Sequence, residues 1–195
     1  MSDEPRRIIR TGSPSWEPVT LSEAKTHLAI ADVDDAHDVY ITGLIKGARE
    51  VVEHDCQVAL ATGTHTLTLD DFDDEDEIYL PIKPVTSITS ITYIDAAGAT
   101  QAWSSAYYVL DNNTPTPAVR LAYNASWPTT RGEPNAVTIT IVAGYSTRSA
   151  VPQSFKQMML LEIARQFGDR EGAETLPENA AYERIRARLE RSTYP

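Results

Sequence analysis

The sequence predicts an α+β protein, in which a small helical bundle formed by the N- and C-terminal helices carries an inserted antiparallel β-domain. Near both ends of the chain, apolar residues recur every three or four positions, as on one face of a helix. Between residues 64 and 146 they recur every second position, which is typical of strands. Because neither helical end can form a core alone, we expect the two ends to pack together.

The expected organisation has three parts. Residues 1–18 contain three prolines and little periodicity, so we expect an extended N-terminal arm. Residues 19–63 and 147–195 should together form the helical domain. Residues 64–146 should form the inserted β-domain, with about six or seven short strands and prolines between them, where a missing backbone amide is tolerated.

The first helix has a defined start. Residues 20–23, Thr-Leu-Ser-Glu, form a capping box, in which the N-cap hydroxyl and the N3 carboxylate each accept a hydrogen bond from the other residue's amide. A stronger helical pattern follows, from about Ile41 to Cys56, and Gly43 and Gly47 lie inside it. Each glycine costs up to about 1 kcal/mol relative to alanine, so either another backbone approaches closely there or the glycines are tolerated on the surface.

An acidic turn separates these two helices and can cap the second of them; its acids are Asp32, Asp34 and Asp35. Near the other end of the chain, Pro152 fits the first turn of a helix that should end at Gly168. A last helix should begin near Pro177. Its apolar stripe is Tyr182, Ile185 and Leu189, and the arginines around that stripe are Arg184, Arg186, Arg188 and Arg191.

The last helix has two interpretations. Its apolar stripe can cap the helical core of the same chain. Alternatively, the helix docks on another protein, and its arginines pair with an acidic partner surface.

Composition and charge restrict the function. The 195 residues are 42% hydrophobic and carry a net charge of −11, which is unsuited to gripping DNA through its phosphates. An acidic wall instead repels a passing duplex. The single cysteine cannot form an intrachain disulfide, and no secretory signal or apolar run of about 18 residues is visible. We therefore expect an intracellular protein that does not span a membrane.

The most conspicuous local feature is an acidic run of seven carboxylates. It lacks the glycine and the spaced oxygen ligands of an EF-hand loop. We interpret it as a solvated connection between strands, and divalent-cation binding or an electrostatic role in an assembly stay open as alternatives. The carboxylates are Asp70, Asp71, Asp73, Asp74, Glu75, Asp76 and Glu77.

The sequence offers no clear catalytic residue. The histidines lack zinc-site spacing, and no phosphate-cradling or serine-hydrolase motif occurs. His54 and Cys56 are two residues apart, so a helix would point them about 200° from each other. Cys56 is better interpreted as a small, buried apolar residue. We expect no catalytic residue, no metal and no cofactor.

Two other functions were weighed. A carbohydrate-binding β module could use an aromatic platform, although aromatics on strands more often pack a sheet face. An acid-pair hydrolase needs two carboxylates about 5–10 Å apart, and with 28 acidic residues some pair always looks suitable. The platform candidates are Trp103, Trp127, Tyr107, Tyr108 and Tyr123.

The order of several phrases resembles the head-tail connector (adaptor, or head completion) proteins of long-tailed phages, prophages and gene-transfer agents. Together the phrases cover most of residues 18–171. No single phrase is catalytic, and the specificity lies in their order. They are PVTLSEAKTHLAI at 18–30 followed by ADVDDAHDVYITGLIKGAREVVEHDC, then LPIKPVTSITSITYIDAAGAT at 80–100, NASWPTTRGEPNAVTITIVAGY at 124–145 and VPQSFKQMMLLEIARQFGDRE at 151–171.

The resemblance implies a structural virion protein rather than an enzyme. Such proteins form a homo-oligomeric ring of about twelve copies below the portal protein. The ring extends the DNA channel, through which DNA passes without specific binding, and gives stopper and tail-terminator proteins a docking surface. The implied location is the head-tail neck of the virion, reached from the host cytoplasm during assembly.

The resemblance also suggests contact residues. In such relatives, C-terminal helical segments contact the portal, and we extend this expectation to the last helix. Since a ring contact is heterologous, each copy must present two different faces, and the helix with Gly43 and Gly47 is a candidate subunit contact. The expected portal-docking residues are Tyr182, Arg184, Ile185, Arg188 and Leu189.

Overall fold

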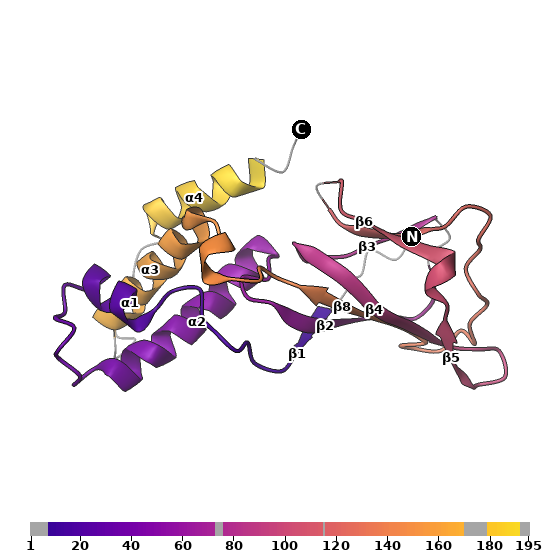
Figure 1. The fold of residues 1–195 in the computed structure, drawn as a ribbon, viewed down its shortest axis with the longest axis horizontal. Helices are drawn as coiled ribbons and strands as arrows, with labels where there is room; N and C mark the ends of the chain where they lie inside the picture. Colours follow the sequence, from indigo (N-terminus) through magenta and orange to yellow (C-terminus); the bar gives the residue numbers. More distant parts are fainter. Residues whose placement is uncertain (1–7, 73–75, 115, 170–178, 192–195) are drawn as a thin grey trace. The chain divides into compact units, whose positions relative to one another are not determined.

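The chain folds as an α+β protein, as the sequence predicts, and its described residues form four α-helices and antiparallel sheets (Figure 1). The structure is a computed structural model that describes residues 8–72, 76–114, 116–169 and 179–191. Among these described residues, no helix combines the length and the apolar character that crossing a membrane requires.

The chain divides into two compact units. The β unit contains residues 1–13 and 62–144, and the helical unit contains residues 14–61 and 145–195.

The β unit consists of two antiparallel sheets. The larger has the strand order β1-β2-β8-β4-β5, and the smaller has the order β3-β7-β6. The strands are β1 (Ile8–Thr11), β2 (Gly63–Leu69), β3 (Glu77–Tyr79), β4 (Val85–Ile94), β5 (Thr100–Trp103), β6 (Tyr108–Asp111), β7 (Ala118–Leu121) and β8 (Val137–Ala143).

A row of buried side chains crosses the larger sheet. Ile139 of β8 lies opposite Leu67 on one side and Ile91 on the other, and all three are completely buried. Ile91 in turn lies opposite Trp103, and Leu67 lies opposite Ile8. Because strand side chains alternate between the two faces, this register places the alternate apolar residues of β8 on the buried face.

The expected N-terminal arm is not a separate part. Its residues 8–11 form β1, an edge strand that pairs with β2 in the β unit. From Pro14 onward the arm belongs to the helical unit. The sequence did not predict β1, because four residues show too little alternation and their partner strand lies more than fifty residues away.

The helical unit has one core shared by all four α-helices. Apolar residues of α2 and α3 supply most of it, and Ala24 of α1 and Tyr182 of α4 complete it. The helices are α1 (Leu21–His27), α2 (Asp38–Cys56), α3 (Gln153–Gly168) and α4 (Ala180–Arg191), with short 3-10 turns at Ser105–Tyr107 in the β unit and Arg148–Ala150 in the helical unit.

The capping box at the start of α1 is confirmed. The Thr20 hydroxyl accepts a hydrogen bond from the amide of Glu23 at 3.1 Å, and the Glu23 carboxylate accepts one from the amide of Thr20 at 2.7 Å. The acidic turn does not cap α2, however. The N-cap of α2 is His37, and its side chain makes no capping hydrogen bond.

Instead, a buried lysine fixes the connection between α1 and α2. Lys25 is only 2% exposed, and its Nζ donates to the backbone oxygen of Asp32 at 2.8 Å and to the carboxylate of Asp38 at 2.9 Å. The hydroxyl of Ser22 also donates to the Asp32 carboxylate. Side chains of α1 therefore hold the middle of the connection and the start of α2.

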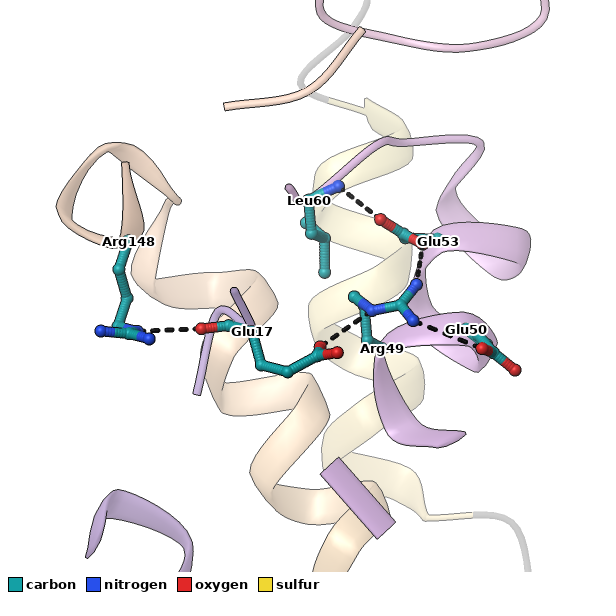
Figure 2. A network of polar contacts seen from close by, with 6 residues as sticks. All are labelled: Glu17, Arg49, Glu50, Glu53, Leu60 and Arg148. Atoms are coloured by element: carbon teal, nitrogen blue, oxygen red, sulfur yellow. Dashed lines mark hydrogen bonds and ion pairs between the residues drawn. The ribbon is translucent and has the colours of Figure 1, made fainter. Parts of the chain in front are cut away.

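A buried arginine organises the rest of the helical unit (Figure 2). Arg49 is 5% exposed and lies between Glu17, 2.8 Å from its Nε, and Glu53, 2.6 Å from its Nη1. Burial alone would lower the pKa of Arg49, but the charges of Glu53 and Glu17 outweigh it and raise the pKa. The guanidinium therefore stays charged, and its burial is compensated mainly by these two partly buried carboxylates, while the exposed Glu50 lies 3.3 Å from its Nη2.

We call Arg49, Glu17 and Glu53 the Arg49 network. The chain passes between the two units three times, and the network contacts the helical unit's segment at each of these crossings. The carboxylate of Glu53 also accepts the amide of Leu60, just before the chain leaves at Ala61. The backbone oxygen of Glu17, near the first crossing, accepts from Arg148, which follows the last crossing at Tyr145. Figure 2 shows the three segments meeting around Arg49.

Removing the buried charge should destabilise the helical unit. In Arg49→Met, Glu17 and Glu53 stay partly buried without their cation, and we expect the free energy of unfolding to fall by about 3 kcal/mol. Urea denaturation measures this loss. The matched control is Glu50→Gln, because Glu50 is 71% exposed and its ion pair should contribute less than about 0.5 kcal/mol. Equal effects of the two substitutions would contradict the structural role of the network.

The capping box should make stability depend on pH. Burial disfavours the ionised form of Glu23, but hydrogen bonds from Thr20 outweigh it and hold the pKa of Glu23 below its ordinary 4.5. The stabilisation is therefore complete above pH 4.5 and is lost as the pH falls through the lowered pKa. Thr20→Ala should cost about 1 kcal/mol at pH 7, and this difference from wild type should shrink below pH 4.5.

Chemical denaturation from pH 7 down to pH 3 tests this expectation. Thr20→Ser keeps the hydroxyl and serves as the control, since it should follow the wild type throughout. A difference between wild type and Thr20→Ala that stays constant across this range would refute the role of the Glu23 carboxylate.

Candidate assembly surface

The apolar stripe of α4 lies against the core of its own unit. Tyr182 is 7% exposed, and Ile185 and Leu189 pack against the same core cluster. The Tyr182 hydroxyl donates to the Asp55 carboxylate at 2.7 Å. Burial, and then this hydrogen bond, raise the pKa of Tyr182 far above its ordinary value, so the hydroxyl remains a donor. Of the two interpretations of the stripe, the structure favours the one in which it caps the core.

The opposite face of α4 carries the other two expected docking residues. Arg184 and Arg188 are exposed, and residues four apart are neighbours on a helix surface. Neither forms an ion pair with a residue that the structure describes, whereas Arg186 lies 3.5 Å from Glu183. We call Arg184 and Arg188 the arginine face. These two residues can contact a partner without any rearrangement of the helical unit.

The connection between α1 and α2 exposes apolar and acidic groups together. Val33 is 93% exposed, and its neighbours Asp34 and Asp35 are also exposed. We call these three residues the valine–aspartate loop. Sequence reasoning had treated the acids only as a helix cap. No sequence signal marks this loop as a contact surface, because single exposed apolar residues are common on protein surfaces.

The two glycines of α2 are not required by close packing against the residues that the structure describes. A Cβ atom at Gly43 would meet nothing within 4 Å, and one at Gly47 would lie 3.8 Å from a side-chain oxygen of Gln166. Gly43 is exposed and Gly47 is half-buried. No described backbone segment therefore approaches them closely, and their role as a subunit contact stays a prediction.

The acidic run is attached to the β unit at its described ends. The Asp70 carboxylate accepts the amide of Asn135 at 2.8 Å, and the Asp71 carboxylate accepts the Thr130 hydroxyl at 2.8 Å. These residues are therefore bound to the loop before β8 and are not simply solvated. Three members of the run lie outside the described residues; they are Asp73, Asp74 and Glu75.

The other end of the run borders a shallow cavity of about 350 Å³, lined by Asp76, Glu77, Arg120 and Leu121. The Arg120 guanidinium lies 2.8 Å from the Glu77 carboxylate and 2.9 Å from that of Asp111. The Arg120 guanidinium thus lies between the carboxylates of Glu77 and Asp111, where a metal cation would have to bind. Nowhere in the described part of the chain do three or more His, Cys, Asp or Glu residues gather in an arrangement able to hold a metal ion.

The aromatic residues of the β unit mostly pack against one another. Phe72 stacks on Trp127 with ring centroids 5.1 Å apart, and Trp103 lies 4.9 Å from Trp127 and 5.2 Å from Tyr108. Phe72, Trp103 and Tyr108 are buried, whereas Tyr123 is 94% exposed. The residues of the candidate sugar platform therefore divide into a packed cluster and single exposed side chains. Most of them pack within the β unit, as in the alternative interpretation.

His54 and Cys56 do not form the arrangement of a catalytic pair. The exposed His54 ring has its Nδ1 3.4 Å from a carboxylate oxygen of Asp55. Cys56 is half-buried and packs against the helical core, as expected for a small apolar residue.

Several solved structures contain a chain with a similar fold. A chain from the neck of an empty gene transfer agent (GTA) particle, computed with C6 symmetry, is similar with a TM-score of 0.77 and 23% identity over 94% of each chain. A chain from the virion of a native GTA particle has a TM-score of 0.73 and 23% identity, covering 94% of this chain and 93% of that one. A chain from the neck of a native GTA particle, computed with C12 symmetry, has a TM-score of 0.71 and 22% identity over 94% of each chain.

At these identities the likeness concerns the fold alone. No curated protein matches the sequence. A family model gives the stronger result, because the model for phage gp6-like head-tail connector proteins matches residues 18–119. This match spans more than half of the chain and includes the capping box and all of α2. The chain therefore belongs to the phage gp6-like head-tail connector protein family.

Proposed function

We propose that this protein is a structural component of a virion neck, where about twelve copies form a ring below the portal protein. The family match carries the proposal. The similarity in fold to neck chains over 94% of the sequence supports it, and one of those necks was computed with C12 symmetry. The ring extends the DNA channel, and its far side receives the stopper and tail-terminator proteins.

The charge of the chain suits a conduit for DNA. Each copy carries −11, so a ring of twelve has a charge on the order of −130 before counterions bind. Phosphates are repelled by such a ring, and the duplex passes without a specific contact. This property needs no catalytic residue and no cofactor.

The arginine face of α4 is the cationic surface best placed to bind a protein partner. Arg184 and Arg188 are exposed and fixed on a helix that Tyr182 and Asp55 hold to the core. A rigid pair of guanidinium groups binds carboxylates well. We propose that this face binds an acidic protein surface within the neck.

Electron microscopy tests the proposed ring. The purified chain should form a closed ring coaxial with purified portal rings of the same virus, because the portal aligns the copies in the order that closes the ring. The control is the same chain without portal, which should form few or no rings. A chain that remains a single particle at saturating portal concentration would exclude the connector role.

A second measurement tests whether the protein leaves duplex DNA unbound. Electrophoretic mobility of a duplex should not change when the chain is added at physiological salt, since the protein has no excess of basic residues to displace counterions. The comparison is a basic DNA-binding protein of similar size. Retardation that weakens steeply with salt would indicate a grip on phosphates and would contradict the conduit interpretation.

A further inference from the structure

We propose that neighbouring copies in the ring contact each other head to tail, with the arginine face of one copy against the valine–aspartate loop of the next. This inference rests on the proposed ring and names the partner of the arginine face. The partner is a second copy of this chain.

The arginine face forms no ion pair with the residues that the structure describes. Arg184 and Arg188 are about 6 Å apart along the axis of α4, and neither is paired with a carboxylate that the structure describes. Ala181 lies one turn before Arg184 and is also exposed, so a small residue leaves room beside the guanidinium groups. The face therefore offers two charges and a shallow apolar surface.

The valine–aspartate loop has the complementary chemistry. Asp34 and Asp35 form no ion pair with a described residue, and Val33 projects between the acids of the turn with 93% of its surface exposed. The carboxylates fit the guanidinium groups, and a valine fits the aliphatic stems of the arginines.

The loop is held in one conformation before any partner arrives. Lys25 binds the backbone oxygen of Asp32 in the middle of the connection and the carboxylate of Asp38 at the start of α2, and the amide of Asp34 donates to the carbonyl of Ala31. A contact made by an ordered loop loses less conformational entropy than one made by a flexible loop.

The two surfaces lie on different sides of the helical unit. In Figure 1 the connection between α1 and α2 is at the far left of the unit, beside the start of α2, and α4 runs along its upper side. Two different faces on one subunit are what a head-to-tail contact requires, and repeated rotation then closes a ring. A chain with the same fold occurs in a neck computed with C12 symmetry, so a second copy is a natural occupant.

Charge reversal tests the contact. Arg184→Glu/Arg188→Glu and Asp34→Lys/Asp35→Lys should each lower the fraction of portal particles that carry a ring by at least about tenfold, because like charges then face each other at every subunit boundary. All four positions are exposed, so each variant should keep the melting temperature of the wild type within a few degrees.

Mixing the two variants should restore the ring. A copy with reversed arginines then places glutamates against lysines, and the next copy places its native arginines against native aspartates, so the two variants alternate. Arg131→Glu is the matched control, because it reverses a 54% exposed arginine on the β unit and should leave ring formation unchanged.

The remaining outcomes separate this inference from the proposed function. If only the arginine variant fails and mixing does not restore rings, the arginine face binds the portal, and the subunit contact is overturned while the connector role stands. If both variants form rings as well as wild type does, the contact is also overturned. If wild type itself forms no ring on the portal, both the connector role and the contact fall.

Discussion

The helical unit depends on the pairing of one buried arginine with two carboxylates. A guanidinium taken out of water is tolerated only when its charge is compensated by well-placed partners, so Arg49 fixes Glu17 on one side and Glu53 on the other. These two glutamates in turn bind the amide of Leu60 and the side chain of Arg148. The three segments by which the chain enters or leaves the unit are thus held to the same turn of α2. An apolar core alone would not specify their positions so closely, because hydrophobic packing is not directional.

Helix α2 is therefore the element around which the assembly surfaces are arranged. Its buried face supplies the core, and its side chain Asp55 holds α4 through the Tyr182 hydroxyl. Its first residue pairs with Lys25 and so helps to fix the connection from α1. The charged groups that these tasks use are all paired within the helical unit. The charges of the arginine face and the valine–aspartate loop are exposed and form no ion pair with a described residue, and they lie on elements that α2 positions, which is why we assign them to contacts with other molecules.

The sequence predicted the features that local physics determines. The capping box, the end of α2 at Cys56 and the alternation along β8 each depend on residues a few positions apart. Features set by distant partners were missed. The pairing of β1 with β2 and the Arg49 network join residues that only the fold brings together. The sequence also could not decide between the two interpretations of α4, because a stripe such as Tyr182 and Ile185 has the same spacing whether it faces its own core or a partner.

A contact between copies that relies on a few charges has a consequence for assembly. Exposed ion pairs contribute little individually and are screened by salt, so two free copies gain only a small stabilisation from one such contact. In a closed ring every copy makes the contact twice, and the portal holds the copies at a high effective concentration. The sum of many weak contacts then favours the ring only where the portal is present. The overall charge of −11 acts in the same direction, because it keeps free copies apart in solution. An extended apolar interface would lack this dependence, since it would join copies before they reached the portal.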